Sequence, residues 1–256
     1  LLLAALVWAR GRMPHVRQAL RDRRTAWLMV AASILIGLNW GLFIWATMSG
    51  YVLDAALGYY TVPLLSVALG VLVLKERLRP LQWLAIAIAA CSVVYVTVDN
   101  GSLPWIGLAL AGTWAIYGFV KKRAGVDAIE SLVIESGLIA PLALAYVRYL
   151  HASGQGSFGA YGVTHALALA GSGVFTAAPL LLFGAAVVRT PLSTLGFMQY
   201  ISSSIQFVLG VWVFDEAMSA GRFVGFAITW VALAILTFDS VRSRRGLPPT
   251  AIVEPD

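Results

Sequence analysis

The sequence predicts an all-α integral membrane protein, a bundle of five plus five transmembrane helices arranged as an inverted repeat, here lacking the first helix and most of the second. Three observations predict this fold: the apolar composition, the confinement of charge to short loops, and a similarity between the two halves. Of the 256 residues, 60% are hydrophobic and 12% are charged, about half the charged share of a soluble domain. One core of this size cannot bury so much apolar surface.

Eight stretches reach, or come within one turn of, the roughly 20 apolar residues that a helix needs to cross a bilayer. They are Thr25–Met48, Ala55–Leu74, Leu81–Val98, Pro104–Val120, Ala128–Leu150, Ala166–Val188, Leu192–Phe214 and Ala220–Phe238. A ninth stretch, Leu1–Ala9, is too short to cross, and the chain begins with Leu rather than Met. We interpret it as the tail of a truncated span rather than a signal peptide, because it has no basic n-region and no small-residue cleavage site.

Charged residues avoid these nine stretches. Only four of the 30 charged residues lie inside them: Glu130, Glu135, Arg148 and Arg222. The helices of soluble proteins carry polar residues at every turn, so this segregation indicates helices surrounded by lipid. Of the 18 Lys and Arg residues, 16 fall in alternate loops and the C-terminal tail. The positive-inside rule assigns that side to the cytoplasm.

The basic charge therefore reports topology and contact with membrane lipid. No soluble segment combines basic and aromatic residues, so we expect no nucleic-acid binding. A single cysteine, Cys91, excludes a disulfide framework and a cysteine-rich metal or iron–sulfur site.

The two halves of the chain are similar to each other. Shifting the sequence by 140 residues aligns 55–95 with 195–235 without a gap, and Glu76 then meets Glu216. We expect both glutamates to cap their turns and the following helices rather than to touch substrate. The chain accordingly divides into a first repeat at 1–98, truncated at its N-terminus, a second repeat at 104–238, and a cytoplasmic tail at 239–256, which we expect to be disordered.

Each complete repeat holds five spans, and an odd number makes the second copy enter the membrane from the opposite side. Inverted repeats are typical of secondary transporters, whose substrate site lies near the bilayer midplane at the repeat interface.

Polar residues form a stripe at membrane depth. In the span Leu192–Phe214 they recur on one helical face, at Gln199, Ser202, Ser203 and Gln206. The same register in Ala55–Leu74 gives Tyr59, Pro63 and Ser66. Two interpretations stay open: hydrogen bonds between helices, which Ser and Gln make routinely, or the wall of a water-filled cavity.

Four further residues are candidates. The mid-span position of Asn39 favours a side chain facing a cavity over a satisfied helix–helix contact. Glu135 is the only carboxylate well inside a span and is a candidate for proton coupling, the alternative being a residue close enough to the interface to reach headgroups. Trp114 and Tyr117 are candidate aromatic walls, although aromatic residues at helical spacing are more often packed.

Several motifs closely resemble the RarD branch of the EamA family, within the drug/metabolite transporter superfamily. They are Asn39-Trp40, Leu57-Gly58-Tyr59-Tyr60, Lys75-Glu76-Arg77-Leu78-Arg79-Pro80-Leu81-Gln82-Trp83-Leu84, Gly101-Ser102-Leu103-Pro104-Trp105 and Gln199-Tyr200-Ile201. The resemblance covers nearly the whole chain and implies a bacterial inner-membrane permease with ten spans and both termini cytoplasmic. It also implies a central cavity framed by the first, third, fourth, sixth, eighth and ninth helices. This sequence departs from the family in lacking the first helix, a cavity wall.

We therefore expect a permease for small metabolites or amphipathic compounds that works by alternating access. We expect no enzyme activity, no cofactor and no metal. The predicted substrate-binding residues are Asn39, Trp40, Tyr59, Tyr60, Ser66, Trp114, Tyr117, Gln199, Ser203 and Gln206, with Glu135 as the coupling candidate.

Two alternatives stay open, a membrane-embedded enzyme acting on a lipid-linked substrate and a membrane protein that does not transport. A weak homodimer through Gly37-x-x-x-Gly41 or Gly221-x-x-x-Gly225 is a further hypothesis.

Overall fold

A computed structural model describes residues 2–99, 101, 105–156, 161–212 and 220–245, and the regular secondary structure of these residues is entirely α-helical. The helices are α1 (Leu2–Ala9), α2 (Met13–Arg21), α3 (Arg23–Met48), α4 (Val52–Leu72), α5 (Pro80–Asp99), α6 (Trp105–Ala124), α7 (Ala128–Ala152), α8 (Gly162–Arg189), α9 (Leu192–Trp212) and α10 (Ala220–Arg245). Each of the eight expected spans coincides with a helix, which confirms the all-α fold class.

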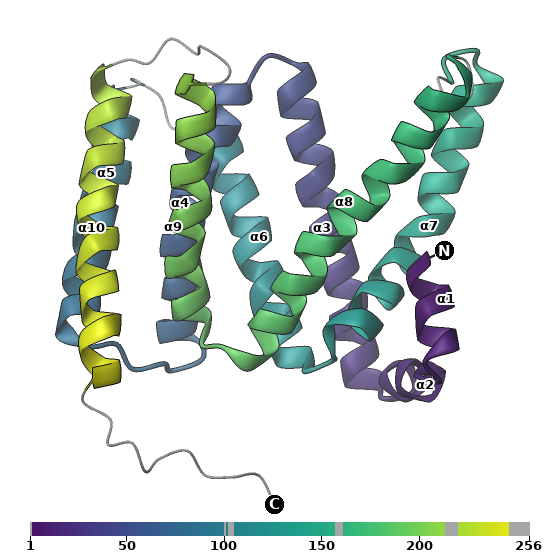
Figure 1. The fold of residues 1–256 in the computed structure, drawn as a ribbon, viewed down its shortest axis with the longest axis horizontal. Coiled ribbons are helices and arrows are strands. Elements are labelled where there is room, and N and C mark those ends of the chain that lie inside the picture. The colour runs from purple at the N-terminus through teal and green to yellow at the C-terminus, as the bar shows by residue number, and fades with distance from the viewer. Residues whose placement is uncertain (1, 100, 102–104, 157–160, 213–219, 246–256) are drawn as a thin grey trace, which may run out of the picture. The chain divides into compact units, whose positions relative to one another are not determined.

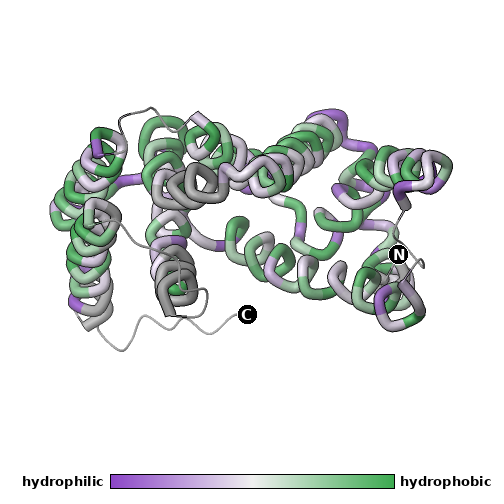
Figure 2. The backbone as a smooth tube through the Cα atoms, turned by 90° about the horizontal axis from the view of Figure 1, so that it is seen from above, coloured by the Kyte–Doolittle hydropathy of each residue, from purple (hydrophilic) through white to green (hydrophobic). Residues whose placement is uncertain are grey.

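Four of the described helices, α3, α5, α7 and α8, are long and apolar enough to cross a membrane. Hydrophobic residues predominate along the helices (Figure 2). Large apolar side chains such as Leu142, Phe175 and Leu182 are exposed on α7 and α8. Exposure of this kind is unfavourable in water and is the expected outer surface of a bundle in lipid. The chain is therefore a multi-pass membrane protein.

The helices form two compact units. Unit 1 comprises 1–44 and 116–192, and unit 2 comprises 45–115 and 193–256. Each unit draws segments from both of the predicted repeats, so the repeat boundary at 98–104 does not separate the units. The repeats themselves stay a prediction about topology.

In unit 2, α5 and α10 lie side by side (Figure 1). Ser92 donates a hydrogen bond to the carbonyl of Gly225 at 2.7 Å. A Cβ atom at Gly225 would collide with Val96, and one at Gly221 with Asp99. The glycine pair of α10 thus allows close approach to α5 within the chain. Of the two glycine pairs considered for a homodimer contact, only Gly37 and Gly41 of α3 therefore remain candidates.

Also in unit 2, α4 and α9 approach closely. A Cβ at Gly196 of α9 would lie 2.8 Å from the Pro63 carbonyl oxygen and 3.1 Å from Ser66 Cβ, both of α4. Ser66 is therefore buried in a helix–helix contact. Beyond the end of α4, Glu76 Oε2 accepts hydrogen bonds from the Ser193 amide at 2.9 Å and the Ser193 hydroxyl at 2.7 Å. The carboxylate of Glu76 thus caps α9, while the expectation that it caps the following helix, α5, stays a prediction. Glu216 lies outside the described residues.

The last helix is longer than expected. α10 continues to Arg245, so residues 239–245 of the tail expected to be disordered are helical. Asp239, in this extension, is buried, and its carboxylate lies 3.4 Å from the Arg79 guanidinium. This ion pair ties the end of α10 to the segment before α5. Residues 246–256 lie outside the described part of the chain.

Candidate functional site

The candidate site of unit 1 is a buried ion pair between α6 and α7. The Lys121 ammonium lies 2.8 Å from Glu135 Oε1, and the two side chains are only 1% and 2% exposed. The short connection between the two helices turns the chain back on itself and brings the end of α6 beside the start of α7. Moving a charge out of water costs several kcal/mol even after relaxation, so charges buried this deeply are found paired and hydrogen-bonded.

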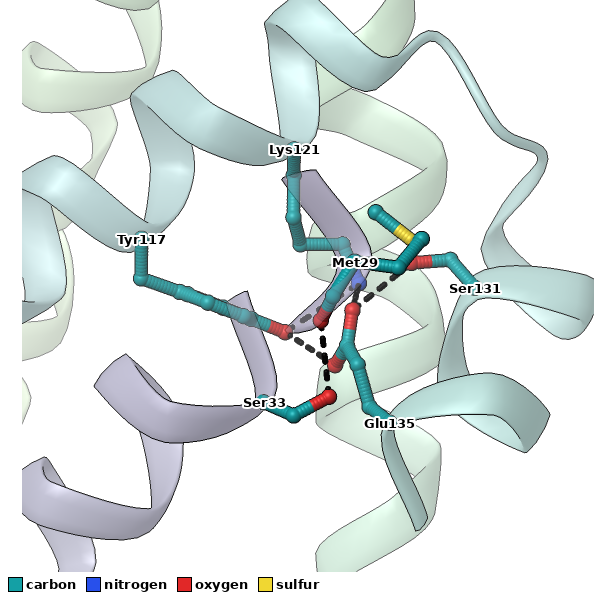
Figure 3. A network of polar contacts seen from close by, with 6 residues as sticks. All are labelled: Met29, Ser33, Tyr117, Lys121, Ser131 and Glu135. Atoms are coloured by element: carbon teal, nitrogen blue, oxygen red, sulfur yellow. Dashed lines mark hydrogen bonds and ion pairs between the residues drawn. The ribbon is translucent and has the colours of Figure 1, made fainter. Parts of the chain in front are cut away.

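Tyr117 and Ser131 complete a set that we call the Lys121 network: Tyr117, Lys121, Ser131 and Glu135 (Figure 3). Tyr117 donates to Glu135 Oε2 at 2.9 Å, and Ser131 donates to Glu135 Oε1 at 2.7 Å. Lys121 also donates to the Tyr117 hydroxyl at 3.1 Å. Tyr117 precedes Lys121 by four residues on α6, and Ser131 precedes Glu135 by four on α7. One helical turn on each side therefore supplies the whole network.

Two other helices of unit 1 border the network. On α8, a Cβ at Gly184 would lie 3.5 Å from Lys121 Nζ and 3.2 Å from Ala128 Cβ. The absence of a side chain at Gly184 thus lets α8 approach the ammonium. The rings of Tyr117 and Phe183 stack with centroids 6.1 Å apart. On α3, the turn that holds Met29 and Ser33 lies beside the network (Figure 3), and Ser33 donates to the Met29 carbonyl at 2.8 Å.

In this arrangement the contact between α6 and α7 depends on the charge of Glu135. Among the described residues, Glu135 accepts hydrogen bonds from three donors, Lys121, Tyr117 and Ser131. A buried pair of this kind contributes little net stability, but removing one partner costs about 3–5 kcal/mol because the other charge stays buried alone. Neutralising the carboxylate would therefore weaken the contact between α6 and α7.

The sequence singled out two members of this network, Tyr117 and Glu135, and the structure brings them together. It did not single out Lys121, which stands with Lys122 and Arg123 in a basic run typical of a cytoplasmic loop. The three differ in the structure: Lys121 is buried, Lys122 donates to the Thr190 carbonyl, and Arg123 is exposed. The available signal was the four-residue spacing from Tyr117, opposite an acid in the next span.

The other predicted site residues are divided between the two units. In unit 1, Asn39 is buried and Trp40 is exposed. In unit 2, Ser66 is buried, and Trp114 and Gln199 are half-buried. The side chains of Tyr59, Tyr60, Ser203 and Gln206 lie outside the described residues. The role of these residues in substrate binding stays a prediction.

The orientation of α9 within unit 2 bears on the polar stripe. Tyr200 packs in a core with Ala85 of α5 and Ala232 of α10, and Trp230 of α10 donates to Ser204 at 2.9 Å. Tyr200 and Ser204 thus define the face of α9 that contacts α5 and α10. Successive residues of an α-helix are about 100° apart, so Gln199, the first residue of the stripe, is turned away from this face.

The described residues contain no group of three or more His, Cys, Asp or Glu side chains arranged to hold a metal ion.

Comparisons with known proteins identify the family. The model of the EamA-like transporter family matches residues 1–98. Protein RarD of Streptomyces exfoliatus is 46% identical over 230 residues, which cover 90% of this chain and 73% of that protein. An uncharacterized transporter of Pseudomonas aeruginosa is 41% identical over 249 residues, which cover 96% of this chain and 83% of that protein.

A solved crystal structure aligns with a TM-score of 0.62 and 19% identity, over 94% of this chain and 83% of its own, which is a likeness of fold alone. The relatives are named as transporters or as RarD, and their identity extends over most of the chain. The chain therefore belongs to the EamA-like transporter family, as a RarD-type member.

Proposed function

We propose that this protein is a solute permease of the bacterial inner membrane, with a cytoplasmic C-terminus, that moves small metabolites or amphipathic compounds by alternating access of two inverted repeats. Its family supplies the class of activity. The observation that carries the proposal is the buried pair of Lys121 and Glu135, because ionisable residues among membrane helices mark substrate paths and proton relays.

In this proposal Glu135 is the proton-coupling group. Protonation neutralises its carboxylate and leaves the Lys121 ammonium buried without a counter-charge, which costs about 3–5 kcal/mol. About 5.5 kcal/mol moves a two-state equilibrium from 1:99 to 99:1. The free energy lost with the ion pair is somewhat smaller than this, but it is large enough to shift most of the protein from one conformation to the other. The contact between α6 and α7 is the part of the structure that would change.

The substrate in this proposal contacts polar and aromatic residues of several helices. We assign this role to Asn39, Trp40, Tyr59, Tyr60, Ser66, Trp114, Tyr117, Gln199, Ser203 and Gln206. For Gln199 the assignment is supported by the orientation of α9, since Tyr200 and Ser204 occupy the face toward α5 and α10. A polar stripe on another face of a membrane helix requires polar neighbours or water.

Reconstitution tests the proposal. Proteoliposomes are loaded with a cytosolic metabolite extract and with ethidium, an amphipathic probe, and the solutes released are measured by mass spectrometry and fluorescence against protein-free liposomes. We expect at least one solute to leave faster with the protein, at a rate that depends on a pH gradient. Glu135→Gln removes the titrating group, so its flux loses the pH dependence. Asp239→Asn is the matched control, because it changes another buried, ion-paired acid outside the network, and it keeps the dependence.

Each result has a separate meaning. Release no faster than from protein-free liposomes, for every solute, contradicts the permease. Full pH-dependent flux in Glu135→Gln removes proton coupling from this residue. Unchanged flux in both Gln199→Ala and Gln206→Ala removes the two glutamines from the substrate site.

A further inference from the structure

Unit 1 contains a pocket that is separate from the Lys121 network. It has a volume of about 520 Å³ and lies between α2 with the α2–α3 turn on one side and the α6–α7 turn on the other. A cavity of this size accommodates a small molecule. The polar side chains that line it are Arg12, His15, Gln18, Asp22, Asp127 and Glu130. Most of these residues lie in the segments between the expected spans, so we expect the pocket to face water rather than lipid.

A guanidinium group already occupies one wall of this pocket. Arg12 Nε lies 2.8 Å from Glu130 Oε1, and Arg12 donates through its terminal nitrogen to Asp127 at 2.7 Å. One cation therefore bridges two carboxylates from the start of α7. Arg189 reaches Asp127 only at 3.7 Å. This geometry is the one that carboxylates use to recognise a planar cation.

The carboxylate of Glu130 lacks hydrogen-bond donors. Glu130 is 1% exposed, and neither of its two buried oxygens accepts a hydrogen bond from a described residue, although Oε1 lies 2.8 Å from Arg12 Nε. An ionised carboxylate has room for about four hydrogen bonds, and a buried acceptor without a donor is costly. Glu130, which lines the pocket, thus carries a buried oxygen, Oε2, that has no donor among the described residues.

The charges around the pocket favour a cation as the missing donor. Three carboxylates line it, against one guanidinium and one histidine. The other arginines of the same loop, Arg10, Arg17, Arg21, Arg23 and Arg24, are exposed and do not line it. At about 0.15 M salt their fields are screened over roughly 8 Å. No group of His, Cys, Asp or Glu among the described residues is arranged for a metal ion, so the pocket suits an organic cation.

We propose that this pocket binds a small organic cation, whose ammonium or guanidinium group donates to Glu130 Oε2 beside Arg12. The site is distinct from the Lys121 network and does not depend on transport.

Binding to the purified full chain in detergent micelles at 0.15 M NaCl tests the proposal. The probes are n-butylguanidinium and n-butylurea, which have nearly the same shape and differ in charge. Calorimetric titration is expected to show saturable binding of n-butylguanidinium and at least about tenfold weaker binding of n-butylurea. Glu130→Gln keeps the size of the side chain and removes its charge, and it is expected to weaken n-butylguanidinium binding about tenfold or more.

A second variant keeps the test decisive if Glu130→Gln does not fold. Gln18 is an exposed lining residue of α2, so Gln18→Lys adds a competing cation without disturbing a buried group, and binding is expected to fall by a similar factor. Leu20→Lys, on the same helix outside the lining, adds the same charge and is expected to leave binding unchanged. Equal binding of the two probes, or full affinity for n-butylguanidinium in Gln18→Lys or in folded Glu130→Gln, overturns the proposal.

Discussion

The carboxylate of Glu76 accepts hydrogen bonds from both the backbone amide and the hydroxyl of Ser193, at 2.9 Å and 2.7 Å. The two residues are 117 positions apart, and their contact fixes the segment after α4 to the start of α9. The first amides of a helix lack intrahelical partners, and the N-terminal end carries a partial positive charge. A carboxylate from a distant turn thus does for α9 what a local capping residue does elsewhere.

Removal of this cap should lower stability. We expect Glu76→Ala to reduce the free energy of unfolding by about 1 kcal/mol, as for other lost caps. Glu76→Gln keeps an acceptor oxygen and should lose less. Thermal unfolding in detergent measures both. An alanine variant as stable as the natural protein would mean that the contact with Ser193 contributes nothing to stability.

The close approach of α4 and α9 predicts that a larger residue at Gly196 destabilises the protein. A Cβ at Gly196 meets the backbone oxygen of Pro63 at 2.8 Å, and backbone cannot rotate aside. Gly196→Ala should therefore destabilise the protein by about 1–3 kcal/mol. Gly112 of α6 has nothing within 4 Å of its Cβ position, so Gly112→Ala should be neutral or stabilising by up to about 1 kcal/mol. Equal unfolding temperatures for the two variants would refute the tight α4–α9 contact.

The hydrogen bonds of Asp22 at the start of α3 predict that the stability of the protein depends on pH. Asp22 accepts hydrogen bonds from the Thr25 hydroxyl and amide, and these hold the pKa of Asp22 below its ordinary value of 3.8. Because the pKa is lowered in the folded state, the contribution of Asp22 is fully present above the ordinary value and is lost as the pH falls through the lowered one. Asp22→Ala should thus be less stable than the natural protein at pH 7, and the difference should shrink below pH 3.8. A difference that stays constant down to the lowest pH at which the protein folds would argue against the cap.

A double-mutant cycle tests the pairing of Lys121 with Glu135 apart from transport. Lys121→Met and Glu135→Leu should each destabilise the protein by about 3–5 kcal/mol, because each leaves one buried charge alone. The double variant removes both charges and should recover most of that loss. Unfolding in detergent supplies the four free energies. If the losses of the single variants simply add in the double variant, the two side chains are not coupled.

Hydrophobicity and charge placement predicted the helices well, because they report directly on which segments lipid surrounds. The start of α7 at Ala128 and the start of α9 at Leu192 coincide with the expected spans. Helical segments outside the expected spans escaped this signal. α2 lies within a loop rich in arginine, and α10 continues through residues 239–245 of the expected tail.

The candidate site was only partly predictable. Glu135 was identified because an acid inside an apolar span is unusual. Lys121 was not, because a lysine at the end of a span normally faces the interface and its burial depends on α7 and α8 folding over it. The partner of Glu76 was equally hidden, since Ser193 is adjacent only in the folded chain. Sequence periodicity reports the face of one helix and carries no information about which distant residue meets it.

Alternating access is tested most directly by the reactivity of introduced cysteines. The natural Cys91 is exposed, so Cys91→Ser supplies the background for Asn39→Cys and Gln199→Cys. Leu142→Cys, at an exposed apolar position of α7, is the lipid-facing control. A membrane-impermeant maleimide is applied to right-side-out and to inverted membrane vesicles. Alternating access predicts that the variants at Asn39 and Gln199 react from both sides of the membrane while the Leu142 variant reacts from neither. If both variants stay as unreactive as the control in both kinds of vesicle, the two positions do not line a water-filled path and the central claim is contradicted.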